Sequence, residues 1–230
     1  MMYPMMDPTF LLLIPALLLA AFAQMKVRSS FAKYSEIYAA KGISADSVSR
    51  ILLDRFGLQN VRIERVSGNL TDHYDPRSKV LRLSDSVGGN ASIAAIGVAA
   101  HEVGHAIQDK EGYAPLRFRN ALVPVANIGS TAAFPLFLIG LLMSAEPLLN
   151  IGIILFSGVV LFHVITLPVE FDASSRALKL LGNTGTLTQQ ELGGAKSVLT
   201  AAALTYIAAT VMALAQLLRL LILANGRRNN

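Results

Sequence analysis

Four long apolar blocks constrain the fold of this chain more than any other feature of its sequence. They span residues 10–25, 121–143, 148–169 and 198–224. A helix needs about 20 mostly apolar residues to cross the hydrocarbon core, and lipid offers no partner for open backbone polar groups. Each block therefore predicts a transmembrane helix. The first is interpreted as a retained anchor rather than a signal peptide, because no Lys or Arg precedes it and it has no clear small-x-small cleavage site.

The distribution of charge predicts which connecting segments share a side of the membrane. The chain has 20 Lys and Arg against 15 Asp and Glu. Residues 26–119 hold 14 of those 20 basic residues, whereas the connector 144–150 has none. The positive-inside rule therefore places residues 26–120 and 170–197 on the cytoplasmic side. There is no basic tract and no nucleic-acid motif, so we expect no nucleic-acid partner.

These features predict a mainly α-helical membrane protein with about four transmembrane helices and a small cytoplasmic α+β, zincin-like unit. The expected segments are an N-terminal transmembrane anchor, a cytoplasmic metal-binding unit, a transmembrane hairpin, a cytoplasmic helix, and a C-terminal transmembrane or interfacial helix: residues 1–25, 26–120, 121–169, 170–197 and 198–230. Arg219 makes the last block a poor span, and Arg227 with Arg228 would lie outside after a fourth crossing. The side of the C-terminus therefore stays open.

Local patterns predict the elements of the cytoplasmic segments. Helical spacing, strand alternation and turn residues indicate a helix over 44–57, strands over 61–66 and 79–83, a turn at 75–78, and an apolar helix from Ser92 to about Gln108. Thr188 and Glu191 form a capping box that should open the helix leading into the last block.

The clearest chemical pattern is His101-Glu102-x-x-His105. Residues i and i+4 lie on one face of a helix, so both imidazoles can bind a single ion. Glu102 is one step beyond and is the predicted base that takes a proton from a metal-activated water. The chain has no cysteine, so His, Asp or Glu must hold any metal. A chance match on a surface helix is disfavoured, because apolar residues precede the motif and Gly104 leaves room beside the metal.

A third ligand is expected, because a catalytic zinc site usually has three protein ligands and one open position. Glu170 is favoured, since it follows Pro168 at the cytoplasmic exit of the third block and should begin a helix there. The competing explanation is a first-turn acid favoured by the helix dipole. His73 lies in a turn-rich segment, and His163 is expected to pack within the transmembrane bundle. Asp172 is expected to face solvent or add charge to the helix start.

The segment before the metal helix is a candidate for substrate binding. In zincin-like folds a strand here pairs with substrate backbone, and residues 80–83 are expected to do so. His73 or Tyr74 nearby can then stabilise the oxyanion of the tetrahedral intermediate. The alternative is that residues 72–78 are an ordinary polar turn, and the sequence leaves both possibilities open.

Two resemblances extend this interpretation. The motif followed at long distance by Glu170-Phe171-x-Ala173 resembles the gluzincin layout of the HtpX and CAAX prenyl protease group of membrane metalloproteases. In that group the Glu of an E-F/Y-x-A-D segment is the third zinc ligand, which implies this role for Glu170. Ser174 stands where the group has Asp, although a hydroxyl one turn from Glu170 can still orient it.

The second resemblance covers nearly the whole chain. Four strings are similar to the YugP-type neutral zinc metallopeptidases of bacteria: residues 70–77, 100–108, 113–117 and 167–171. This resemblance implies the fold and one Zn²⁺ per chain more than any substrate.

The sequence thus predicts an integral-membrane zinc endopeptidase of the bacterial plasma (inner) membrane, with its active site facing the cytoplasm. Its expected partners are the lipid bilayer and a protein or peptide substrate that is itself membrane-associated. A site-2-type intramembrane protease is disfavoured, since it requires an Asp-Gly ligand segment and the chain has no Asp-Gly. A membrane scaffold or chaperone-like protein with a structural or vestigial metal site is the other alternative. Glu102 argues against it, because a structural site needs ligands and no base.

Overall fold

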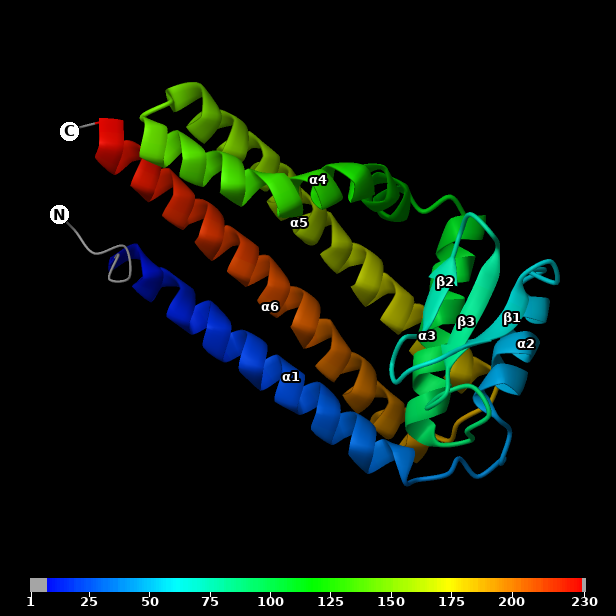
Figure 1. The fold of residues 1–230 in the computed structure, drawn as a ribbon. Helices are drawn as coiled ribbons and strands as arrows, with labels where there is room; N and C mark the ends of the chain where they lie inside the picture. Colours follow the sequence, from blue (N-terminus) through cyan, green and yellow to red (C-terminus); the bar gives the residue numbers. More distant parts are fainter. Residues whose placement is uncertain (1–7, 229–230) are drawn as a thin grey trace. The chain divides into compact units, whose positions relative to one another are not determined.

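The chain, as a computed structural model, is described over residues 8–228 and consists of long helices with one small sheet (Figure 1). Its elements are a 3-10 helix at Pro8–Leu13, α1 Ile14–Ser35, α2 Ala45–Arg55, β1 Arg62–Val66, β2 His73–Asp75, β3 Val80–Ser84, α3 Ile93–Lys110, α4 Ala114–Met143, α5 Glu146–Asn183 and α6 Gln189–Arg228. The start of the predicted anchor, residues 1–7, and the end of the C-terminal segment, residues 229–230, lie outside the described range.

The chain divides into two compact units, and the long helices contribute residues to both. Unit 1 is Met1–Ala23, Arg117–Leu167 and Thr205–Asn230, and unit 2 is Gln24–Leu116 and Pro168–Leu204.

The apolar blocks form helices long enough to span a bilayer. Within residues 8–228, four helices meet this criterion by length and composition: Pro8–Ser35, Ala114–Met143, Glu146–Asn183 and Gln189–Gly226. Large apolar side chains on them face outward, with Leu18 66%, Leu142 74% and Ile154 69% exposed. Apolar surface of this kind is favourable against lipid and unfavourable against water. The predicted mainly helical fold, with four helices long and apolar enough to span a membrane, is therefore confirmed.

Unit 1 is held together by close helix packing. A methyl group at Gly152 in α5 would lie 2.8 Å from the carbonyl oxygen of Ala133 in α4, so only glycine allows this approach. Phe137 is 1% exposed and packs in a cluster with Leu149 of α5 and Leu220 of α6. Small residues at helix crossings are typical of membrane bundles, because packing replaces the hydrophobic drive that lipid removes.

Unit 2 contains a three-stranded mixed sheet with the order β1-β3-β2. β1 pairs with β3 in parallel, and β2 pairs with β3 antiparallel. The two strands predicted at 61–66 and 79–83 correspond to β1 and β3, whereas β2 was not predicted. The expectation that residues 80–83 bind substrate as an added strand is wrong, because β3 is central and both of its edges are already paired.

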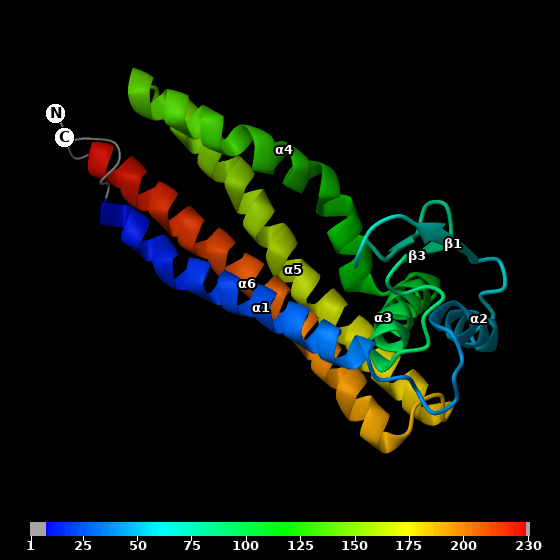
Figure 2. The same cartoon turned by 60° about the horizontal axis from the view of Figure 1, so that its bottom comes forward.

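The core of unit 2 forms around α3, which packs on α2 and on the sheet (Figures 1 and 2). Leu52 of α2, Leu81 of β3, and Ile96 and Val103 of α3 are at most 1% exposed. The helix was predicted to start at Ser92, which is the N-cap of α3, and its hydroxyl accepts a hydrogen bond from the amide of Ala95 at 3.3 Å. The helix that carries the motif is thus anchored along its buried face.

The predicted capping box is present at the start of α6. The Thr188 hydroxyl accepts from the amide of Glu191 at 3.3 Å, and the Glu191 carboxylate accepts from the amide of Thr188 at 2.7 Å. The same carboxylate also accepts from the amide of Ala40 at 2.6 Å, so the box ties the start of α6 to the segment after α1.

The predicted helix start at Glu170 is wrong, because α5 runs without interruption from Glu146 to Asn183. Pro168 lies inside this helix and removes one backbone hydrogen bond, a loss that helices in membrane proteins tolerate. Glu170 is therefore in mid-helix, far from the first turn, and the helix dipole does not explain a carboxylate there.

Candidate metal centre

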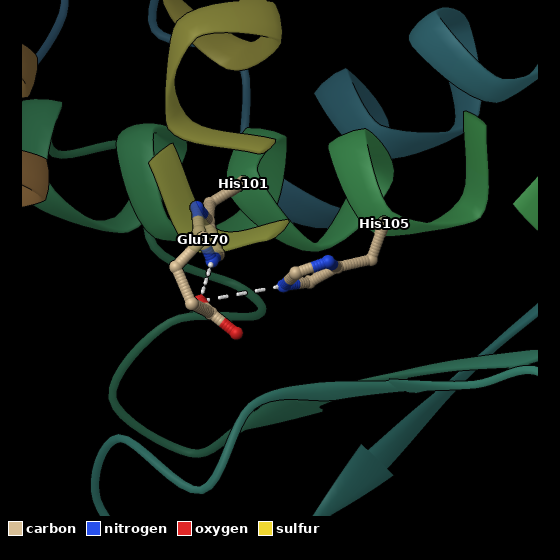
Figure 3. Close-up of side chains that lie close together, drawn as sticks. All are labelled: His101, His105 and Glu170. Atoms are coloured by element: carbon tan, nitrogen blue, oxygen red, sulfur yellow. Dashed lines mark hydrogen bonds and ion pairs between the residues drawn. The ribbon is translucent and has the colours of Figure 1, made fainter. Parts of the chain in front are cut away.

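The two histidines of the motif and Glu170 lie together in unit 2. His101 and His105 are one turn apart on α3, and Glu170 approaches them from α5 (Figure 3). The Oε2 atom of Glu170 lies 3.2 Å from His101 Nε2 and 3.6 Å from His105 Nε2. One ligand atom from each residue lies within 4.8 Å of the other two. The three predicted ligands thus point to a common position.

These separations fit a tetrahedral zinc ion. Two ligands held about 2.0–2.1 Å from zinc at the tetrahedral angle stand roughly 3.3 Å apart. Two imidazole nitrogens and one carboxylate are also a ligand set of catalytic zinc sites, although other divalent ions accept it as well. The residues present therefore fit the metal that the sequence predicts.

The electrostatics of the pocket favour a cation. Burial alone disfavours the charged form of His105, which is 8% exposed. The hydrogen bond with Glu170 and the charge of Glu102 outweigh that effect and raise the pKa of His105 above its ordinary value. The two carboxylates thus stabilise positive charge at this point, whether on an imidazole or on a metal ion.

Each imidazole has a partner on the side away from Glu170. His101 Nδ1 lies 3.1 Å from the Ser174 hydroxyl, and His105 Nδ1 lies 3.0 Å from Oε1 of Gln108. Partners of this kind orient metal-binding histidines and select their tautomers. Ser174 thus has a contact in the site although it replaces the Asp of the E-F/Y-x-A-D pattern.

Gly104 determines how closely α5 approaches the motif. A methyl group at Gly104 would lie 2.7 Å from the backbone oxygen of Ala173 and 3.2 Å from its Cα. The expected room beside Gly104 is therefore filled by the α5 backbone. Ala173 is itself fully buried and lies one turn after Glu170. Because both residues are small, Glu170 can reach the two histidines.

Glu102 lies on α3 directly after His101 and is 8% exposed. Its Oε2 atom accepts a hydrogen bond of 3.0 Å from the backbone amide of Tyr74 in β2. The predicted base thus lies between α3 and the edge strand, close enough to His105 for its charge to raise the pKa of that imidazole.

The other two predicted catalytic residues, His73 and Tyr74, are adjacent in β2 but face different partners. The Tyr74 hydroxyl donates to Asp109 at 2.7 Å, and burial together with this carboxylate raises the pKa of Tyr74 above its ordinary value. His73 is exposed, with Nδ1 2.9 Å from the Thr71 carbonyl and Nε2 3.4 Å from Arg82. The Tyr74 hydroxyl is thus occupied by Asp109, whereas His73 stays accessible.

Two residues near the site were misjudged or missed from sequence. Asp172 was expected to face solvent or start a helix. Instead it accepts from Gln108 at 2.8 Å and from Arg176 at 2.5 Å, in mid-helix. Gln108 had no predicted role, yet it contacts His105. The sequence did contain a signal for Gln108: it is a polar residue one turn after a predicted ligand, on a helix with a broad apolar face. His163 belongs to unit 1 and is not part of the ligand cluster found among the described residues.

Comparisons with known proteins agree with this chemistry. A family model described as "Putative neutral zinc metallopeptidase" matches residues 9–225. A protein of Bacillus subtilis named "Putative membrane protease YugP" is 49% identical over 220 residues, which cover 95% of this chain and 98% of that protein. No solved structure is detectably similar to the chain.

The close approach at Gly104 gives a testable prediction. Replacing Gly104 by Ala should push α5 away from α3, lower stability by about 1–3 kcal/mol and weaken zinc binding, because Glu170 moves with α5. Gly193 is a matched control on α6, since a methyl group there meets nothing within 4 Å. Melting temperature and zinc affinity in detergent test both variants. Wild-type values for Gly104→Ala would show that the crossing does not position Glu170.

Proposed function

Because this chain belongs to the family described as "Putative neutral zinc metallopeptidase", we propose that it is an integral-membrane, zinc-dependent endopeptidase. His101, His105 and Glu170 are the proposed ligands of one zinc ion per chain. The observation that supports this most is the convergence of Glu170 Oε2 on both Nε2 atoms, at 3.2 and 3.6 Å, from a helix far away in sequence.

Glu102 is the proposed general base. Zinc, when bound, would polarise a peptide carbonyl and make water acidic enough to react near neutral pH. Glu102 Oε2 accepts from the Tyr74 amide, which leaves the second carboxylate oxygen to take a proton from the attacking water. The protonated carboxyl can then deliver this proton to the leaving amine. A purely structural metal site would need the three ligands but not this buried acid.

β2 is the proposed source of oxyanion stabilisation. His73 lies directly opposite Arg82 in the β2–β3 pairing, with its Nε2 3.4 Å from the Arg82 guanidinium, so these two side chains are the proposed partners of the oxyanion. Tyr74 contributes through its backbone amide, which holds Glu102, because its hydroxyl is donated to Asp109. This modifies the expected role of Tyr74 and keeps that of His73.

The proposed location is the plasma membrane of a bacterium, with the metal centre facing the cytoplasm. The excess of basic residues in 26–119 and their absence from the connector 144–150 support this orientation. A site carried by a protein with several membrane spans would meet substrates that are themselves membrane-associated, which makes such proteins the proposed substrate class.

Metal content tests the ligand set. Detergent-purified wild type should contain about one zinc per chain by mass spectrometry, and His101→Ala and Glu170→Ala should lose it or bind it far more weakly. His163→Ala is the control and should keep zinc, since His163 belongs to unit 1. Zinc retained in Glu170→Ala would exclude Glu170 as a ligand and return attention to His73.

Catalytic roles can be separated from metal binding by variants that keep zinc. Glu102→Gln should retain zinc and lose about 10²–10⁴-fold in hydrolysis of fluorescein-labelled casein, because a general base contributes on that scale. His73→Ala should lose about 10²–10³-fold in kcat, the scale of one oxyanion donor. Arg77→Ala, on the exposed turn after β2, is the control. Unchanged hydrolysis in Glu102→Gln would exclude Glu102 as the base, whereas a cellular role that survives this substitution would favour the scaffold or chaperone-like alternative.

The orientation can be tested because the chain has no cysteine. Single cysteines at Ser47, exposed in α2, and at Ser144, exposed between α4 and α5, should differ in labelling by a membrane-impermeant maleimide. In intact cells Ser144→Cys should react, and Ser47→Cys should react only after the cells are permeabilised. The reverse pattern would place the metal centre outside the cytoplasm.

A further inference from the structure

Gln108 is the most completely buried polar side chain around the metal centre, and every polar atom of its carboxamide has a partner. It is 0% exposed and lies one turn after His105 on α3. Its Oε1 is 3.0 Å from His105 Nδ1. Its Nε2 donates to the Val169 carbonyl at 2.9 Å and to Oδ2 of Asp172 at 2.8 Å.

These partners determine which way the carboxamide points. The Val169 carbonyl and the Asp172 carboxylate only accept hydrogen bonds, so the side of the amide that faces them must be its NH₂ group. Oε1 must then face His105, and an oxygen acceptor there requires the hydrogen of the imidazole on Nδ1. The lone pair of neutral His105 is left on Nε2, the atom that faces Glu170 at 3.6 Å.

Asp172 is fixed in turn by charge. Arg176 donates to Asp172 Oδ2 through Nε at 2.5 Å and to Glu111 Oε2 through another nitrogen at 2.6 Å. Asp172 and Arg176 lie one turn apart on α5, whereas Glu111 directly follows α3. The contacts thus form one chain: His105, Gln108, Asp172, Arg176 and Glu111. Arg176 thus holds the Asp172 carboxylate in the position where it accepts from Gln108.

We propose that Gln108 is a positioning residue for the metal ligand His105, with α5 as its reference. The carboxamide fixes the imidazole in the tautomer whose Nε2 can bind the metal, and it takes its own orientation from Val169 and Asp172. Glu170 lies between these two residues in sequence, so the segment that supplies the third ligand also orients the second one. This inference rests on the proposed metal centre and assigns a role to a residue that neither binds metal nor touches substrate.

The competing explanation is that Gln108 merely joins two helices. In that case its loss lowers stability and leaves the metal affinity of the folded protein unchanged. Gln108→Met keeps the length of the side chain and removes all three hydrogen bonds. Ile107→Ala is the matched control: Ile107 is 1% exposed on the same helix and is not part of the chain of polar contacts, so its truncation should destabilise the core without affecting the His105 tautomer.

The test measures zinc affinity by competition with a chelator, and the visible spectrum of the cobalt-loaded protein, for folded variants in detergent. Gln108→Met should bind zinc about 10–100-fold more weakly and show a changed cobalt spectrum, because loss of a partner of a ligating histidine has effects of this size. Ile107→Ala should melt at a lower temperature with the wild-type affinity and spectrum. Wild-type affinity and spectrum in Gln108→Met would overturn the proposal.

A second measurement needs no variant. The metal-free wild type, labelled with ¹⁵N-histidine, has four histidines whose ring nitrogens nuclear magnetic resonance can distinguish, with His105 assigned by substitution. The neutral form of His105 should carry its hydrogen on Nδ1, and a neutral form that carries it on Nε2 instead would overturn the proposal. A wild type that binds no zinc would overturn the proposed function, and this inference with it, whereas zinc-binding wild type with an unaffected Gln108→Met would overturn this inference alone.

Discussion

The proposed metal centre depends on the close crossing of α3 and α5. Gly104 has no side chain, and the backbone of Ala173 occupies the space that a methyl group would need, 2.7 Å from the Ala173 oxygen. His101 and His105 lie on either side of Gly104 along α3, and Glu170 lies one turn before Ala173. The crossing therefore brings together ligands that are 69 residues apart in the chain. A shift of either helix would change the distances between Glu170 and the two histidines, because closely packed helices move as rigid bodies.

The same crossing buries charge that needs compensation. Glu170 is 4% exposed between two imidazoles, and a buried carboxylate is unfavourable unless it is paired and hydrogen-bonded. Around it the polar atoms are well satisfied: within residues 8–228, Arg50 Nε is the one buried side-chain nitrogen or oxygen found without a partner, and it belongs to α2. A cation bound by both histidines and Glu170 would neutralise this acid, so metal binding would also stabilise the helix pair.

The sequence predicted the elements and ligand pairs that show a regular spacing. It missed the contacts that depend on residues far apart in the chain. Block length predicted the four apolar helices, and the i, i+4 spacing predicted that His101 and His105 share a face. Three residues of β2 are too few to show alternation, and no local pattern reveals that β3 is central. Pro168 predicted a helix boundary, but the membrane-type helix α5 continues through it. Gln108 was missed and Asp172 was misassigned, because their contacts exist only once α3 and α5 meet.

Glu102 is the residue by which the proposed catalytic centre differs from a structural metal site. Glu102 is 8% exposed and accepts a hydrogen bond from the Tyr74 amide. Glu170, in contrast, faces two imidazoles. Burying a carboxylate is unfavourable unless it is paired and hydrogen-bonded, and a structural metal site does not require a carboxylate beyond its ligands. The ligands would still hold zinc without it. The proposed catalytic role accounts for such a residue, because it uses a base beside the metal, and active sites commonly trade stability for activity.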